Sequence, residues 1–361
     1  MECVATTSKA NAPSISSKTA PSDALTLGKQ CREYLDASSN VAGDEVSREV
    51  IIRPADGSKI ECAETDEGKQ EIVIEITYCT EDESKGIVAD GKYFMCPGPT
   101  KRASNWFPCV ERGDVLTLFE FSVSAPRHLQ VITSAHWDRL EKCDADDVDD
   151  DGFRLRHYFS CMYPSFAHEM RMFLGKFRAH SSPVKGVTLF APAGDEFEER
   201  LEIAGAGVGK AITAFEEYLG HPYPVSCLNI VFLPDSYVTS RDEQGCCVNL
   251  LSTKWLVDKS FNSGLLDARL RIASAIASQW FGGIVVPADT TDCWVVEGLA
   301  KYLTGAYVQA LTGLNELSFR RMRDMRTAAL LDDGTTLPPL ASRAARIWRG
   351  GQYAGPDIAA G

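Results

Sequence analysis

Histidine is scarce in this chain, and its distribution is one-sided. All 6 histidines of the 361 residues lie at or before His221, and the rest of the chain contains none. Two histidines four positions apart on a helix commonly hold a catalytic zinc ion, because they lie on the same helix face. The C-terminal part therefore cannot contain a histidine-bearing zinc helix.

Long apolar runs and excess positive charge are also missing. Every apolar run is interrupted by charge within a few residues, so we expect no membrane span. The net charge of −13 and the isoelectric point near 5.0 argue against binding nucleic acid by bulk charge, although a local basic patch could still do so. A chain that is 44% hydrophobic and 24% charged has the composition of a soluble globular protein.

The 12 cysteines include no CxxC pair, and no secretory leader precedes them. This pattern predicts reduced thiols of the cytosol or nucleus. Cys246 and Cys247 are adjacent, which favours small packing residues, with a redox or metal pair as the alternative.

Common catalytic motifs are absent too: the sequence has no G-x-S-x-G, no Walker A loop and no G-x-G-x-x-G after a predicted strand. The glycines of AGAGVGK (204–210) resemble a phosphate loop but fall within a helical pattern, so phosphate binding is the weaker alternative. Asp147, Asp149, Asp151 and Gly152 match the opening of an EF-hand loop. Tyr158 at the twelfth position cannot supply the bidentate carboxylate, which favours a solvated acidic loop over a calcium site.

The first half of the chain has the pattern of a sheet domain behind a tail. Residues 1–25 are rich in Ser, Thr, Ala, Pro and Lys without any period, which predicts a disordered tail. From about residue 47 apolar residues alternate with polar ones, as in antiparallel strands that have one buried face. The predicted strands cover 50–53, 71–79, 115–123 and 128–137, and Ile72, Ile74, Ile76 and Tyr78 share one face of the second.

After about residue 185 the pattern changes to short strands and helices. Strands are predicted at 186–190 and 227–235, around a helix over 198–220. A second helix begins near Gly264, has apolar residues at three- and four-residue steps, and ends at Gly282-Gly283. A third helix is predicted over 293–313. The fold class is therefore α+β, with an antiparallel β-rich domain followed by an α+β domain.

Several motifs in this order resemble the aminopeptidase N family of zinc peptidases. They are ASNWFPCVERGD (103–114), SFAHEMRMFLGKF (165–177), HPYP (221–224), LNIVFLPD (228–235), QWFGG (279–283) and WVVEGLAKY (294–302). The resemblance covers roughly residues 70–310. It implies a partial β-rich N-terminal domain at 26–185 and a thermolysin-like domain at 186–361. It also implies that this second domain is truncated and that the family's C-terminal helical domain is missing.

The residues that carry the family's chemistry are replaced. By the resemblance, the two histidine ligands correspond to Ser274 and Ser278, and the general base corresponds to Ala275. The third zinc ligand corresponds to Glu297, which is retained. The amine-binding Gly-Ala-Met-Glu-Asn motif falls on TSRDE (239–243), where only Asp242 keeps a carboxylate. We therefore predict no zinc, no other cofactor and no enzymatic activity.

Retention of WFPCV and QWFGG without a zinc helix resembles a noncatalytic branch of the family, the aminopeptidase-like TBP-associated factors of general transcription factor TFIID. The resemblance implies a nuclear scaffold that supports transcription initiation, binds other TBP-associated factors and helps TFIID to engage core-promoter DNA. The alternatives are a noncatalytic peptide-binding pseudoenzyme and a degenerate zinc aminopeptidase.

A basic tract supplies the candidate DNA contacts. These are Arg320, Arg321, Arg323 and Arg326, within SFRRMRDMR. An exposed helix face whose acidic partners lie elsewhere is the alternative interpretation.

Overall fold

The computed structural model describes most of the chain from residue 63 to residue 332. The described ranges are 63–64, 70–71, 74–79, 87–96, 103–110, 115–143, 148–149, 152–223, 226–238, 243–258, 262–287 and 292–332. The predicted tail at 1–25 and the predicted strand at 50–53 lie outside them. The described residues before Tyr78 and those from Tyr78 onward belong to separate compact units, and each unit is described by itself.

The first unit contains one short antiparallel pair, β1 (Ala63–Glu64) and β2 (Gln70–Glu71). The strand predicted over 71–79 is wrong for residues 74–79, which have no regular secondary structure. Ile74 and Ile76 are exposed. Alternation alone does not make a strand, because the alternating face needs a paired neighbour and a core to pack on.

Two antiparallel sheets form the β-rich part of the second unit. One has the strand order β3-β4-β10-β6, and the other has the order β5-β9-β7 with β8 paired to β9. The strands are β3 (Val88–Ala89), β4 (Tyr93–Cys96), β5 (Glu120–Pro126), β6 (Gln130–Thr133), β7 (His136–Lys142), β8 (Val148–Asp149), β9 (Gly152–Ser160) and β10 (Met172–Gly175).

These strands differ from the predictions in their bounds. The strand predicted over 115–123 begins only at Glu120, and Leu116 and Leu118 before it are exposed. The strand predicted over 128–137 is split into β6 and β7, which belong to different sheets. Part of the predicted acidic loop pairs as β8 with β9.

A five-stranded mixed sheet follows, in the order β11-β12-β13-β15-β14. The strands are β11 (Phe177–Ser181), β12 (Val187–Pro192), β13 (Leu228–Leu233), β14 (Glu243–Gly245) and β15 (Val248–Ser252). The three central strands are parallel, and the two edge strands are antiparallel to their neighbours. β13 and β15 are almost entirely buried, as expected for parallel strands with both faces covered.

Each face of the mixed sheet packs on a different core. One face contributes Leu189, Ile230 and Phe232 to a core shared with the helices. The other face packs Val231 and Leu250 against residues of the β-rich part. The mixed sheet therefore links the two parts of this unit.

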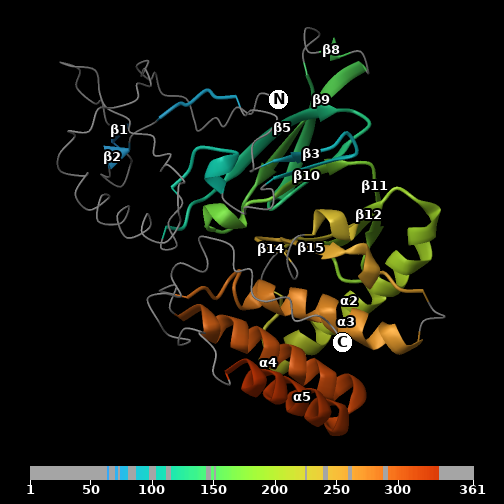
Figure 1. The fold of residues 1–361 in the computed structure, drawn as a ribbon. Helices are drawn as coiled ribbons and strands as arrows, with labels where there is room; N and C mark the ends of the chain where they lie inside the picture. The colour runs from blue at the N-terminus through green and yellow to red at the C-terminus, as the bar shows by residue number, and fades with distance from the viewer. Residues whose placement is uncertain are drawn as a thin grey trace. The chain divides into compact units, whose positions relative to one another are not determined.

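Helices complete the described part of the unit (Figure 1). They are α2 (Glu198–Leu219), α3 (Asn262–Trp280), α4 (Cys293–Thr312) and α5 (Leu314–Asp332). α3 packs against α2 and α4, and α5 packs against α4. Phe215 of α2 meets Trp280 of α3 and Tyr307 of α4 edge to face, with ring centroids 5.8 Å apart in both pairs. The three predicted helices are confirmed to within two residues at their ends.

Five 3-10 turns join these elements. They are η1 (Ala103–Asn105), η2 (Ala167–Glu169), η3 (Asp195–Phe197), η4 (Asp235–Tyr237) and η5 (Thr253–Trp255). The α+β class with antiparallel sheets is confirmed, whereas the expected domain boundaries stay predictions. Among the described residues no helix combines the length and apolarity needed to cross a bilayer.

Candidate functional site

The helix α3 is ended by a glycine pair, as its sequence predicts. Gly282 has a φ of 125°, which few side-chain-bearing residues adopt. A Cβ atom at Gly283 would lie 2.7 Å from the carbonyl oxygen of Gln279. The amide of Gly283 donates to Ser278 O (3.2 Å), and the amide of Val285 donates to Trp280 O (2.9 Å). These bonds satisfy carbonyl groups of the last helical turn and fix the residue at which the helix ends.

Ser274, Ala275 and Ser278 lie in the last two turns of this helix. Both serines are half-buried and Ala275 is buried. The Ser278 hydroxyl contacts the helix backbone, 2.8 Å from Ser274 O and 3.2 Å from Ala275 O. One proton cannot serve both oxygens fully, and the shorter contact is the usual serine bond to the carbonyl four residues back.

Glu297 lies one turn into α4, the helix that packs against α3. Its side chain is exposed, while Val296 and Ala300 face the core. The structure therefore places Glu297 and the two serines on neighbouring helices. Asp242 lies outside the described residues.

This set of donors does not fit a catalytic zinc ion. Protein zinc sites use thiolate, imidazole or carboxylate ligands, and here the candidate groups are two serine hydroxyls, a methyl group and one carboxylate. Among the described residues, no cluster of three or more His, Cys, Asp or Glu side chains could hold a metal ion. No reaction step can be derived through a metal at these positions.

A buried amide network that the sequence did not reveal fixes α3 on the mixed sheet. Gln279 Nε2 donates to Gly245 O (3.0 Å) and to Asn249 Oδ1 (2.9 Å). Asn249 Nδ2 donates to Ala275 O (3.1 Å). Both side chains are 1% exposed, so these bonds form away from water. The network ties the strand pair β14–β15 to the part of α3 that carries Ala275 and Ser278.

The basic tract lies on α5, and its arginines differ in their surroundings. Arg320 pairs with Asp267 of α3 (2.8 Å) and with Glu316 one turn earlier (2.7 Å), and its side chain is 19% exposed. The side chains of Arg321, Arg323 and Arg326 are exposed. Of the four candidates, Arg320 is therefore the one that anchors α5 to α3.

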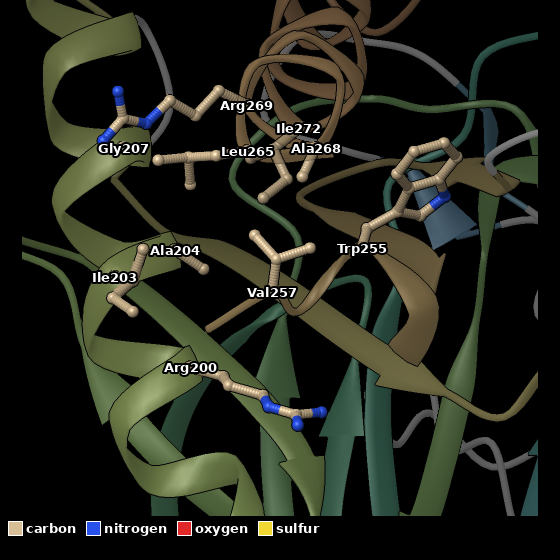
Figure 2. A pocket seen from close by; sticks show the side chains of 10 residues that line it. All are labelled: Arg200, Ile203, Ala204, Gly207, Trp255, Val257, Leu265, Ala268, Arg269 and Ile272. Atoms are coloured by element: carbon tan, nitrogen blue, oxygen red, sulfur yellow. The ribbon is translucent and has the colours of Figure 1, made fainter. Parts of the chain in front are cut away.

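A small open depression lies between α2, α3 and the segment after η5 (Figure 2). Its floor is apolar, formed by residues such as Ala204, Val257 and Leu265, and Arg200 and Arg269 border it. It lies along the first half of α3 and includes none of the candidate site residues.

The phosphate-loop alternative is not supported by the structure. Gly205, Gly207 and Gly209 lie inside α2 and are buried. A Cβ atom at Gly205 would come within 2.8 Å of the His180 ring, so this glycine allows α2 to pack closely on β11.

The calcium alternative also fails. Tyr158 lies within β9, between β5 and β7, and its hydroxyl donates to Glu141 Oε2 at 2.8 Å. An EF-hand would place a helix after the loop, where this chain has a strand.

Comparisons with known proteins agree with this fold. The Peptidase family M1 domain matches residues 204–339. Transcription initiation factor TFIID subunit 2 of Caenorhabditis elegans is 23% identical over 223 residues, which are 62% of this chain and 20% of that protein. TFIID subunit 2 of Danio rerio is 25% identical over 217 residues, 58% of this chain and 17% of that protein. The chain thus spans about a fifth of the length of these relatives.

The relatives also include proteins that are named aminopeptidases. Aminopeptidase M1-B of Oryza sativa subsp. japonica is 31% identical over 104 residues, 28% of this chain and 12% of that protein. Among solved structures, Legionella pneumophila aminopeptidase A matches with a TM-score of 0.57 and 14% identity, covering 66% of this chain and 28% of that one. Native yeast LTA4 hydrolase matches with a TM-score of 0.55 and 19% identity, covering 69% of this chain and 37% of that one. At these identities the structural matches establish the fold alone.

Proposed function

Because this chain has a peptidase M1-like fold related to TFIID subunit 2, we propose that it is a noncatalytic scaffold subunit of TFIID. In this role it supports core-promoter recognition and transcription initiation by RNA polymerase II in the nucleus. Its direct partners are other TBP-associated factors.

The observation that carries the proposal is the identity of the residues at positions 274, 275 and 278 of α3. A zinc peptidase needs ligands and a base there, and this chain has two serines and an alanine. The Ser278 hydroxyl is already bonded to the helix backbone. Relatedness to TFIID subunit 2, together with this loss, favours a scaffold over a hydrolase.

The exposed side of α5 supports contact with other macromolecules. Phe319, Met322 and Met325 are more than half exposed, and Arg323 and Arg326 accompany them on the same helix. Positions 319, 322, 323 and 326 follow the three- and four-residue spacing of one helix face. An exposed apolar and basic face of this kind suits a protein partner or DNA phosphates. We assign the DNA contacts to Arg321, Arg323 and Arg326, because Arg320 pairs with Asp267 and Glu316.

Affinity purification tests the proposal. A tagged copy of the chain is expressed in its own cells, and the proteins that co-purify from nuclear extract are identified by mass spectrometry. We expect TBP-associated factors in amounts comparable to the bait. Recovery without any TBP-associated factor, combined with saturable binding of free peptides by the purified chain, would favour the peptide-binding pseudoenzyme instead.

A further inference from the structure

Four cysteines that are distant in sequence converge beside the mixed sheet. Cys161 directly follows β9, Cys227 directly precedes β13, and Cys246 and Cys247 join β14 to β15. The Cys227 and Cys246 thiols are both close enough to Cys161 to raise its pKa. Together these four side chains form a thiol cluster outside the positions related to the peptidase site.

The backbone holds two members of the cluster in a tight turn. Gly245 pairs with Val248, so Cys246 and Cys247 are the two central residues of a hairpin turn. Cys247 has a φ of 55°, the only positive value among the non-glycine residues that the structure describes. Its carbonyl oxygen accepts a 2.9 Å hydrogen bond from the amide of Asn229, two residues after Cys227. The turn is therefore docked against the start of β13.

Within this cluster Cys247 lies next to Cys227 and Cys246. Its Sγ atom is 3.6 Å from Cys246 Sγ, and its thiol is close enough to Cys227 to lower the pKa of the Cys227 thiol. Cys247 is 6% exposed, whereas Cys227 and Cys246 are partly accessible to solvent. Cys227 is thus a partly accessible cysteine next to a buried one.

The surroundings of Cys227 favour its thiolate. The hydrogen bond from Cys247, followed by those from His136 and Ser226, lowers the pKa of Cys227 to about 7, although burial opposes this shift. Burial raises the pKa of Cys161 to about 12, with a smaller contribution from the neighbouring thiols. The contacts with Cys227 and Cys246 raise the pKa of Cys247, and the contact with Cys247 lowers the pKa of Cys246. The buried phenol of Tyr223 also faces the cluster. A partly accessible thiolate beside a second thiol is the arrangement found in redox-sensing cysteine pairs.

We propose that Cys227 is a peroxide-reactive cysteine and that Cys247 resolves its oxidised form to an intramolecular disulfide. In the first step the Cys227 thiolate attacks hydrogen peroxide; the O–O bond breaks, Cys227 becomes a sulfenic acid, and the released hydroxide takes up a proton to form water. In the second step Cys247 sulfur attacks the sulfenic sulfur, the S–O bond breaks, and the hydroxyl leaves with the Cys247 proton as water. Two electrons pass from the two thiols to one peroxide.

The tryptic map of this chain separates the two partners. Cleavage after Lys210, Arg241 and Lys254 yields one peptide with Cys227 and another with both Cys246 and Cys247. The reduced protein is treated with hydrogen peroxide, its remaining thiols are alkylated, and the digest is analysed by mass spectrometry. We expect a disulfide-linked pair of these peptides, which disappears when dithiothreitol is added before digestion.

Three variants identify the sulfurs. We expect Cys227→Ser and Cys247→Ser to abolish the linked pair and Cys246→Ser to retain it. A linked pair that survives in Cys247→Ser but is lost in Cys246→Ser would overturn the assignment of the resolving cysteine. A product that is only the single peptide lighter by two hydrogens, a bond between Cys246 and Cys247, would overturn the proposal.

A measurement on the unaltered protein keeps the test independent of variant folding. The alkylation rate of Cys227 by iodoacetamide is followed against pH by mass spectrometry, with the exposed Cys79 as an internal reference. Because the pKa of Cys227 is lowered to about 7, we expect its rate to be half-maximal near that pH. A Cys227 rate that still rises steeply above pH 8, like that of an ordinary thiol with a pKa of roughly 8.5, would contradict the proposal.

Discussion

At the scale of single residues, the chemistry of this chain is decided by what α3 carries toward its C-terminal end. Ser274 and Ser278 are four positions apart, the spacing that two zinc-binding histidines need. A serine hydroxyl is a weak zinc ligand, and here the Ser278 hydroxyl is bonded to Ser274 O. α3 therefore has the helical spacing of a zinc-binding pair, with serines at both positions.

Restoring the two imidazoles tests this placement. We expect the double variant Ser274→His and Ser278→His to bind zinc measurably, because the packing of Trp280 and the glycine stop fix the helix register. Binding should be weaker than in a native site, since nothing orients the new histidines. Titration with zinc by isothermal calorimetry measures the affinity.

The third ligand is tested by adding Glu297→Ala to the double variant. If Glu297 completes the site, its removal should weaken zinc binding by at least about tenfold, as even the loss of an orienting group does in natural sites. The parent chain is the matched control for adventitious zinc. Affinity no higher than that of the parent, or no effect of Glu297→Ala, would mean that the register or the third ligand is misassigned.

Gln279 is the residue whose loss should destabilise this region most specifically. In Gln279→Leu, Gly245 O and Asn249 Oδ1 lose a buried donor, at about 1–3 kcal/mol each. We expect the free energy of unfolding in urea, followed by circular dichroism, to fall by about 2–6 kcal/mol in total. Gln309→Leu, the same change at an exposed position of α4, should alter it by less than about 0.5 kcal/mol. Equal effects of the two changes would show that the amide network does not stabilise the fold.

At the scale of secondary-structure elements, helices were more predictable than strands. The helices over 198–220 and 293–313 have their own apolar period and end at Gly220 and Gly313, which both have a positive φ. A strand depends on its partner, so residues 74–79 alternate like a strand without being one. For the same reason the sequence could not predict the network of Gln279 or the thiol cluster. Both consist of residues that are distant in sequence and are brought together only by the fold.

The candidate site shows the same division. The sequence could predict that α3 lacks ligands, because that statement concerns residue types at a fixed helical spacing. It could not predict the partner of Arg320, because Asp267 is 53 positions away and on another helix. From the sequence, Arg320 belongs to the same basic patch as Arg321, Arg323 and Arg326. Only the packing of α5 on the rest of the unit shows that Arg320 is ion-paired while the other three side chains are exposed.

This separation gives a prediction for α5. We expect the triple variant Arg321→Ala, Arg323→Ala and Arg326→Ala to weaken DNA binding similarly on promoter and unrelated sequences. The slope of log affinity against log salt should become shallower by about 0.9 for each DNA phosphate that the variant no longer neutralises. Fluorescence anisotropy at several salt concentrations measures both quantities.

Arg320→Ala is the matched comparison for that variant. It removes the ion pairs with Asp267 and Glu316, so it should lower the thermal stability of the chain and leave the salt slope unchanged. An unchanged salt slope in the triple variant would mean that these arginines do not contact DNA phosphates and belong to an exposed, solvated helix face.

At the scale of the whole molecule, the unit from Tyr78 onward has an M1-like fold, and two serines and an alanine occupy the α3 positions that the resemblance assigns to the zinc ligands and the base. The mixed sheet, α2 and α3 share one apolar core, which includes Ala275, at the position that the resemblance assigns to the general base, but not Ser274, Ser278 or Glu297. The packing of this core therefore does not depend on the residue types at positions 274, 278 and 297.

Metal content and hydrolysis, measured on the same purified protein, test this account most directly. Zinc is determined by inductively coupled plasma mass spectrometry, and activity is assayed with a fluorogenic aminoacyl substrate before and after zinc is added. We predict well under one zinc per chain and no hydrolysis above that of a buffer blank under either condition. About one zinc per chain, with hydrolysis that a chelator abolishes and zinc restores, would contradict the noncatalytic account.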